Sequence, residues 1–329
     1  MKKIPVNRKF VAAMLAAWAS CGGIAAGASA QEFPVKPIRF IVPFPPGGTV
    51  DPLARLIGGK LTAALGQQVI VDNRTGGSGT IGTAIAAKAN PDGYTYLFVF
   101  DTHAVNPALI PNLPFDTLKD LDPVMLVGRA PYGIITHPKK PYRTMTDVIR
   151  TAKAKPDTVT YGTVGAGSLG HLALTLTEQA GGFKLVHVPY KGGGPMTAAV
   201  MGSQIDIGIG STALVTPMVR DNRVRALATT GDQRAQTLPE VTTLVEEGYK
   251  GMTAYAWWGI FTPARTPKPI VARFHAEVVK ALNDADVRKL LVGQLGMELL
   301  VSSPAELQKW TVSELARWAR VIRDHNIKP

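Results

Sequence analysis

The stretch IRFIVPFPPGGTVDPLARLIGGKLTAAL, residues 38–65, indicates the fold in three steps. Its first seven residues are almost all apolar and predict a buried strand over residues 38–44. A loop rich in proline and glycine follows, and from Pro52 onward apolar residues recur at the spacing of an amphipathic helix. Asp51 stands at the expected N-cap and Pro52 at the first helical position. The stretch therefore predicts a strand, a tight loop and a helix.

The same alternation of strand and helix continues along the chain. Strands are predicted over residues 68–73, 94–100, 132–138, 159–161, 184–190, 205–210 and 224–230. Helices are predicted over residues 79–89, 146–155 and 215–220, after residues 170 and 195, and in a tail at 270–283, 285–295 and 304–326. Such alternation indicates an α/β fold with mostly parallel sheets flanked by helices. Two series and a helical tail favour two lobes.

The first thirty residues have the layout of a secretory signal peptide. Four basic residues precede an uncharged, mostly apolar run over residues 10–19, and small residues at 28–30 suit cleavage after Ala30. An uncleaved membrane anchor is the alternative, but residues 20–30 are mostly glycine, alanine and serine, which bury little apolar surface. Lipidation of Cys21 is disfavoured because Trp18 occupies a position that is usually aliphatic. We therefore expect an exported protein.

Composition limits the function further. Cys21 is the only cysteine, so the expected mature chain has no thiol for a disulfide or a metal site. Four of the 36 Lys and Arg residues lie in the leader, which leaves 32 basic against 24 acidic residues and a net charge of +8. This charge favours acidic ligands. Basic residues do not cluster with aromatic ones, so we expect no nucleic-acid partner, and no cofactor motif is complete.

The loop at residues 42–52, VPFPPGGTVDP, has the composition of an anion site. Its two glycines let the backbone approach a ligand, and the helix that follows supplies free N–H groups and the positive end of its dipole. Gly48 and the Thr49 hydroxyl are candidate donors, with Asp51 beside them. A tight turn with a capping aspartate is the structural alternative.

A second glycine-rich loop lies in TYGTVGAGSLGHLAL, residues 160–174, and allows three interpretations. A dinucleotide loop needs an acidic residue about 20 positions on, and that residue is missing. A nucleophile elbow on Ser168, with His171 three residues later, is nearly matched, but no later segment completes a triad. The third interpretation is a carboxylate or phosphate cradle at a helix start, formed by Thr163, Gly167 and Ser168. Neither loop contains arginine or lysine, so amides, hydroxyls and waters would recognise the anion.

The six histidines give no metal site, because no two of them stand at ligand spacing. His103 is kept as a candidate together with Thr102. Both follow the strand that ends at Phe100 and should reach the ligand edge of the sheet. Trp257 and Trp258 belong to the core, line a hinge or stack on a ligand.

Several segments together resemble one family. They are PIRFIVPFPPGGTVDPLAR (37–55), VIVDNRTGGSGTIGTAIAAKANPDGYT (69–95), YGTVGAGSLGHLA (161–173) and VHVPYKGGGPMTAAVMGSQIDI (186–207). In this order they resemble the solute-binding proteins of tripartite tricarboxylate transporters, the Bug or TctC-like proteins of Gram-negative bacteria. The resemblance covers the chain from about residue 33 to its C-terminus.

The resemblance implies a two-lobed, type II-like periplasmic binding protein with a ligand cleft between its lobes. It implies that residues 44–51, which begin with Phe44, and residues 163–168 hold one carboxylate of a small acid with ordered waters. It also implies delivery of that acid to the membrane permease subunits of a tripartite tricarboxylate transporter.

One segment departs from the family pattern. Family members often carry an aromatic and an acidic residue after the strand matched by QIDIGIGSTAL, where this chain has Ile209 and Gly210. We expect a roomier and more apolar cleft at this place. Because no acid is present to hold an amine, we expect a mono- or dianionic acid, aromatic acids included, rather than an amino acid.

The sequence thus predicts a monomeric, non-enzymatic receptor in the periplasm that closes over its ligand. Lobe 1 would comprise residues 31–130 and 255–329, and lobe 2 residues 131–254. The crossovers would lie near residues 128–133 and 253–258. Two alternatives stay open at this point: a component that presents its ligand to a signalling sensor, and an exported serine hydrolase that uses Ser168.

Overall fold

Strands and helices alternate through the first third of the chain. The computed structural model describes residues 33–327, so the expected signal peptide and its cleavage site lie outside the described residues. The first elements are β1 (Ile38–Val42), α2 (Val50–Leu65), β2 (Val69–Asn73), α3 (Thr80–Ala87), β3 (Thr95–Phe100) and α4 (Thr102–Leu109). β1 pairs in parallel with both β2 and β3, as expected of β-α-β units.

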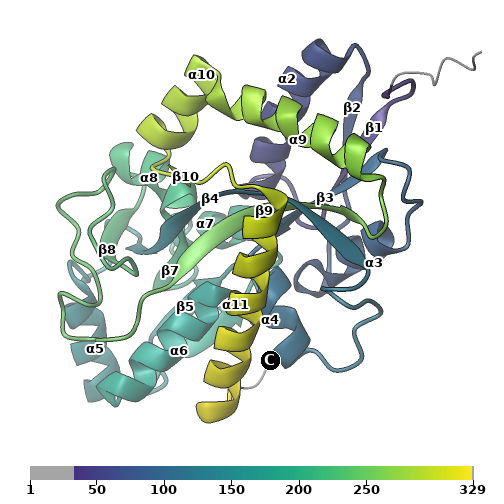
Figure 1. The fold of residues 1–329 in the computed structure, drawn as a ribbon. Coiled ribbons are helices and arrows are strands. Elements are labelled where there is room, and N and C mark those ends of the chain that lie inside the picture. The colour runs from purple at the N-terminus through teal and green to yellow at the C-terminus, as the bar shows by residue number, and fades with distance from the viewer. Residues whose placement is uncertain (1–32, 328–329) are drawn as a thin grey trace, which may run out of the picture. The chain divides into compact units, whose positions relative to one another are not determined.

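Two long strands connect this part of the sheet to the rest. Residues 121–131 of β4 (Leu121–Thr136) pair antiparallel with β9 (Tyr255–Pro263), whereas residues 132–136 pair with β7 and β8. The ten strands form one sheet in the order β2-β1-β3-β9-β4-β7-β5-β6, with β8 and β10 also paired to β4. Figure 1 shows β4 and β9 crossing the middle of the sheet.

The middle of the chain builds a second β-α series. Its elements are α5 (Met145–Ala154), β5 (Thr160–Thr163), α6 (Leu169–Gly181), β6 (Val186–Pro189), α7 (Gly193–Met201), β7 (Ile207–Ser211), α8 (Thr212–Arg220) and β8 (Arg225–Thr229). β5 pairs in parallel with β6 and β7. We call this series the second half, and the elements around β1, β2, β3 and β9 the first half.

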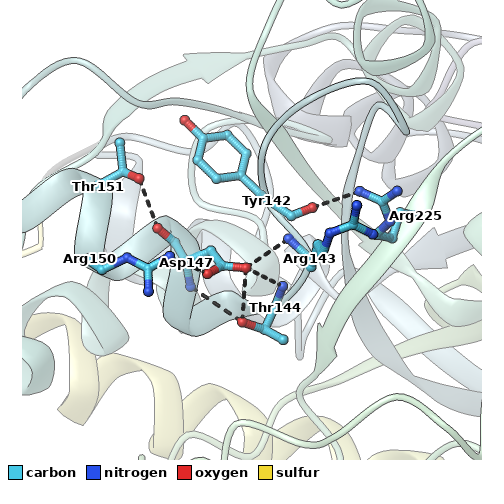
Figure 2. A network of polar contacts seen from close by, with 7 residues as sticks. All are labelled: Tyr142, Arg143, Thr144, Asp147, Arg150, Thr151 and Arg225. Carbon is cyan, nitrogen blue, oxygen red and sulfur yellow. Dashed lines mark hydrogen bonds and ion pairs between the residues drawn. The ribbon is translucent and has the colours of Figure 1, made fainter.

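The start of α5 shows how local sequence fixes a helix end. Thr144 Oγ1 accepts a hydrogen bond from Asp147 N (3.4 Å), and Asp147 Oδ2 accepts one from Thr144 N (3.2 Å). This reciprocal pair is a capping box. Arg225 of β8 donates from Nη1 to the Tyr142 carbonyl (2.9 Å), so the segment before the helix is tied to the sheet (Figure 2).

The C-terminal segment returns to the first half. It contains α9 (Lys268–Asn283), α10 (Ala285–Arg288), a π-helical turn at Lys289–Gln294, β10 (Glu298–Leu299) and α11 (Pro304–Asp324). α9 packs on α2, and α11 packs on β4 and α4 (Figure 1). None of the described helices combines the length and the apolar composition needed to cross a bilayer.

The apolar core of the first half lies on the sheet between these helices. Val99, Leu126, Trp257 and Phe261 belong to one buried cluster, and α11 adds Leu307 to it. Trp257 and Trp258 are both fully buried, at 0% and 1% exposure. The two tryptophans are therefore interior residues of β9. Burial of such large aromatic side chains stabilises the core.

Several sequence expectations differ from the structure. The strand predicted at residues 132–138 is the end of the longer strand β4, which begins at Leu121. α2 begins at Val50 with Thr49 as its N-cap, so Asp51 lies inside the first turn and is not the cap. The helix expected at residues 285–295 divides into α10 and a π-helical turn. α4 and β9 were not predicted: α4 contains a proline, and β9 is so apolar that its strand and core interpretations overlap.

Candidate functional site

The carboxyl ends of five strands surround one small cavity, which we call the central cavity. The loops after β1, β3, β5, β6 and β7 reach it, so both halves contribute walls. Its volume is about 20 Å³, room for about one water molecule. It is lined by Phe44, Gly48, Thr49, Val50, Phe100, Val164, Gly192, Gly193, Ser211 and Leu214. Because open α/β sheets bind ligands at this edge, the central cavity is the candidate site.

Three helices begin at the central cavity. Their N-cap residues are Thr49 of α2, Gly192 of α7 and Ser211 of α8, and none of the three makes a side-chain capping hydrogen bond. The first N–H groups of each helix therefore lack the partner that a cap supplies, and each helix dipole presents its positive end. Backbone N–H groups at helix starts bind carboxylate and phosphate groups. The arrangement thus suits an anion without any cationic side chain.

Two hydroxyl groups add to these donors. Ser211 is 2% exposed, and its Oγ has no hydrogen-bond partner among the described residues. Thr49 Oγ1 accepts a hydrogen bond from Trp258 Nε1 (3.0 Å), which leaves the threonine proton for another acceptor. A buried hydroxyl without a partner is unfavourable, so a ligand that accepts a hydrogen bond from Ser211 removes that penalty.

The remaining walls of the central cavity are apolar. Phe44 and Phe100 meet edge to face with ring centroids 6.0 Å apart, and Phe100 lies 5.6 Å from the ring of Trp258. Val164 and Leu214 line the cavity from the second half. None of the ten lining residues carries an ionisable side chain, so the site offers dipoles, hydroxyls and apolar surface only.

The two halves touch beside the cavity through backbone atoms and through a side-chain hydrogen bond. A Cβ built on Gly194 would lie 3.1 Å from the carbonyl carbon and oxygen of Gly47. Nearby, Ser78 Oγ donates to the Ala166 carbonyl (2.9 Å) and so joins the first half to the second. An alanine at position 194 would press against the Gly47 backbone, so glycine allows the two halves to approach most closely here.

Comparison with known proteins assigns the family. The model of the TctC family, described as the tripartite tricarboxylate transporter family receptor, matches residues 53–327. This chain belongs to the TctC receptor family. It is therefore a solute-binding receptor rather than an enzyme, as the sequence predicted.

Relatives and solved structures agree with that assignment. Protein BugT of Bordetella pertussis is 33% identical over 325 residues, which cover 98% of this chain and 99% of BugT. Rpa4515 of R. palustris, solved with adipate, is 30% identical with a TM-score of 0.86 and covers 91% of this chain and 100% of its own. MatC of Rhodopseudomonas palustris, solved with bound malate, is 30% identical with a TM-score of 0.82 and covers 88% of this chain and 100% of its own. The predicted binding-protein fold is thereby confirmed.

The structure places three of the predicted site residues of this receptor at the central cavity, namely Phe44, Gly48 and Thr49. Asp51 lies elsewhere, because its carboxylate is already engaged. It accepts hydrogen bonds from Arg55 Nε (3.0 Å) and Asn73 Nδ2 (2.9 Å), and it is buried. Asp51 therefore fixes the first turn of α2 against β2 and is not among the residues that line the cavity.

The predicted site residues of the second glycine-rich loop, residues 160–174, do not line the central cavity. Ser168 is fully buried and caps α6 by accepting a hydrogen bond from His171 N (3.4 Å). The His171 ring does not contact this hydroxyl but accepts a hydrogen bond at Nδ1 from Gly167 N (3.2 Å). Thr163 Oγ1 pairs with His187 Nε2 (2.8 Å). A buried serine used as a cap has no geometry for nucleophilic attack, and only the neighbouring Val164 lines the cavity.

His103 and Thr102 do not reach the cavity. Both are buried in α4, and the His103 ring packs 4.9 Å from the ring of Phe261 in the core. Burial lowers the pKa of His103 to about 3, so the ring is neutral. The side chains in the first turn of α4 point into the core. The sequence had predicted a loop at this position, with its side chains at the ligand edge of the sheet.

The expected open space beside Ile209 and Gly210 is filled. Ile209 is fully buried and pairs with Ile134 of β4. A Cβ built on Gly210 would lie 3.0 Å from Leu214 Cδ2 and 3.1 Å from Met196 Cε. The expectation of a roomier cleft is therefore wrong, although the prediction of an apolar wall agrees with Leu214.

Sequence reasoning missed most of the second-half lining, in particular Gly192, Gly193, Ser211 and Leu214. A signal was present for the two glycines, because YKGGGP follows a predicted strand and precedes a helix. Ser211 likewise follows the strand at residues 205–210. Leu214 carried no signal, since an apolar residue in a first helical turn usually belongs to the core.

Proposed function

We propose that this receptor binds a small carboxylate in the central cavity, where the starts of α2, α7 and α8 converge. The observation that carries the proposal is that all three helix starts lack a side-chain cap and face one cavity. The two similar structures hold adipate and malate, and both of these ligands are carboxylates.

The recognition follows from backbone geometry. Each uncapped helix start offers N–H donors and a positive dipole end to one carboxylate. Thr49 and Ser211 add hydroxyl donors from opposite halves. Because no arginine or lysine lines the cavity, the affinity depends on both halves contacting the same anion, which couples binding to closure.

Closure is proposed as a hinge motion of two lobes, residues 31–130 with 255–329 and residues 131–254. The pairing of the strands supports this division. β4 pairs with β9 up to residue 131 and with β7 and β8 from residue 132. The hinge would then lie at residues 128–133 and 253–258, where the chain passes between lobes.

The setting of the receptor follows from its family and its N-terminus. We place it in the periplasm as a monomer that delivers its acid to the membrane permease subunits of a tripartite tricarboxylate transporter. The signal-like first thirty residues and the match to a transporter receptor family support this setting.

A thermal-shift screen tests the proposal. The purified protein is melted with mono-, di- and tricarboxylates, benzoate and amino acids, since a ligand that binds only the folded state raises the melting temperature. We expect a rise with carboxylates that is lost in a Thr49→Val, Ser211→Ala double variant. No rise with any acid, or an equal rise in the double variant, would contradict the proposal.

A further inference from the structure

We infer that Asp101 is a positioning residue that holds the two halves together in the closed state, and that closure over a ligand moves a proton from the solvent onto its carboxylate. The inference rests on the proposed function and its hinge closure, and it names the group that makes closure depend on pH. It is carried by the contacts that the Asp101 carboxyl makes across the boundary between the halves.

The carboxyl of Asp101 lies at this boundary. Asp101 follows Phe100, which ends β3 and lines the central cavity. Its Oδ2 accepts a hydrogen bond from Tyr132 Oη, and its Oδ1 accepts one from Leu169 N at the start of α6 (3.5 Å). Tyr132 lies in the part of β4 that pairs with β7 and β8, and all of these side chains are buried. A carboxyl of the first half is therefore enclosed by groups of the second half.

The segment before α6, residues 165–168, contacts the first half at two more places. Ser78 Oγ donates a hydrogen bond to the Ala166 carbonyl (2.9 Å). A Cβ built on Gly167 would lie 2.6 Å from Leu109 Cδ1, at the end of α4. Because this segment lies beyond the proposed hinge, opening of the halves would break these contacts together with the one from α6 to the carboxyl. Water would then reach the carboxyl.

Burial makes this contact depend on protonation. An ionised carboxylate loses its hydration when it is enclosed, and burial raises the pKa of Asp101 to about 8. Exposure to water in the open state would return this pKa to that of an ordinary aspartate, about 4. The closed state therefore binds a proton that the open state releases. Closure is favoured most below about pH 4, and this contribution is lost as the pH rises toward 8.

The titratable groups around the carboxyl do not reverse this sign. Glu314 on α11 adds a like charge, which raises the pKa of Asp101 further. Burial raises the pKa of Tyr132 well above its usual range, so its hydroxyl keeps its proton. His103 on the adjoining α4 is neutral, because burial lowers its pKa to about 3. His171 on α6 accepts its hydrogen bond from the loop of its own half (3.2 Å), so opening leaves that bond in place.

Calorimetry in several buffers measures the proton uptake. Butanedioate, hexanedioate and benzoate are titrated at pH 7.5 in buffers of different ionisation enthalpy, and the slope of the binding enthalpy gives the number of protons taken up. These acids and the histidines hold almost no protons at this pH, so we expect an uptake of about 0.5 proton or more per ligand at Asp101. Binding without net uptake would overturn the inference and leave carboxylate binding intact. An absence of binding by these acids and by every acid of the thermal-shift screen would overturn both.

Two variants assign the proton to its residue. Asp101→Asn keeps the size of the side chain but cannot titrate, so its uptake should fall to near zero. Glu178→Gln is the matched control. Burial raises the pKa of Glu178 to about 7, but its carboxylate accepts a hydrogen bond from Leu185 N (2.6 Å) within the second half. It should keep the wild-type uptake. Unchanged uptake in Asp101→Asn, or uptake lost in Glu178→Gln, would overturn the inference.

The pH profile of the affinity is the second readout. Between pH 6.5 and pH 8.5 the wild-type affinity should fall by about fivefold or more, whereas that of Asp101→Asn should change by less than about twofold. A merely structural role of Asp101 would lower the affinity of the variant equally at every pH. If Asp101→Asn does not fold, the wild-type protein decides, because a constant wild-type affinity across this range would overturn the inference.

Discussion

The hydroxyl of Thr49 links the core to the central cavity, because it accepts a hydrogen bond from Trp258 Nε1 (3.0 Å) and lines the site. Thr49→Val keeps the shape and removes the donor. We expect an affinity for the carboxylate lowered by about tenfold, since one hydrogen bond to a charged group contributes about 1.5 kcal/mol or more. Titration calorimetry measures this, and Thr49→Ser should retain most of the affinity. Equal affinity in the valine variant would show that the hydroxyl does not contact the ligand.

The stacked histidines behind the site predict a loss of stability in acid. His171 and His187 lie 4.0 Å apart, and burial lowers the pKa of each to about 4. The unfolded chain takes up these protons below about pH 6.5, whereas the folded protein resists until about pH 4. The free energy of unfolding should therefore fall as the pH drops across this window.

Denaturant unfolding of the His187→Gln variant tests the predicted loss of stability between pH 6.5 and pH 4. The variant removes one of the two titrating groups and keeps a polar partner for Thr163 Oγ1. Its loss of stability between pH 6.5 and pH 4 should be smaller than that of the wild type by about 1 kcal/mol or more. Parallel curves for the two proteins would show that the histidine pair does not govern acid stability.

The buried carboxyl of Asp101 predicts a pH dependence opposite to that of the histidines: its contribution to the free energy of unfolding falls as the pH rises. Burial raises its pKa to about 8, although Tyr132 donates a hydrogen bond to it. The unfolded chain loses this proton near pH 4, so stability is greatest below that pH and is lost as the pH rises toward 8. Asp101→Asn should be more stable than the wild type at pH 8 by more than about 1 kcal/mol, as measured by urea unfolding. A less stable asparagine variant at pH 8 would contradict this assignment.

At the scale of elements, the glycine contact between Gly47 and Gly194 controls how closely the halves approach. A Cβ at position 194 would lie 3.1 Å from Gly47 backbone atoms, which cannot move aside as a side chain does. Gly194→Ala should therefore lower ligand affinity by about three- to tenfold. Because alanine favours the helical conformation of α7, the unliganded protein should keep its stability.

Gly59→Ala is the matched control for this contact. It makes the same change inside α2, where a Cβ would meet no atom within 4 Å. Its affinity, measured by titration, should equal that of the wild type. The same loss of affinity in both variants would mean that the effect comes from helix propensity rather than from the contact between halves.

Most elements could be predicted from sequence, because their apolar periodicity is a local property. The strand at β1 and the helix at α2 follow from residues 38–65 alone. The inward-facing helix α4 could not be predicted, because its sequence, THAVNPAL, contains a proline and its burial depends on packing against α11. Leu214 was missed for a related reason: only the folded chain places α8 opposite Phe44 and Gly48.

At the scale of the whole molecule, β4 and β9 contain the residues at which we propose the hinge. β4 pairs with β9 from residue 121 to residue 131, and from residue 132 it pairs with β7 and β8 instead. We expect saturating carboxylate to reduce the radius of gyration measured by small-angle X-ray scattering, because binding favours the closed state. Gly194→Ala should show a smaller reduction, and an unchanged radius in the wild type on saturation would contradict hinge closure.

The most direct test is a crystal structure with the tightest-binding carboxylate from the thermal-shift screen. The account predicts that its carboxylate oxygens lie about 3 Å from backbone nitrogens in the first turns of α2 and of α7 or α8, with Ser211 Oγ donating to the ligand. A carboxylate held by arginine or lysine side chains, or bound away from Phe44, Gly193 and Ser211, would contradict it.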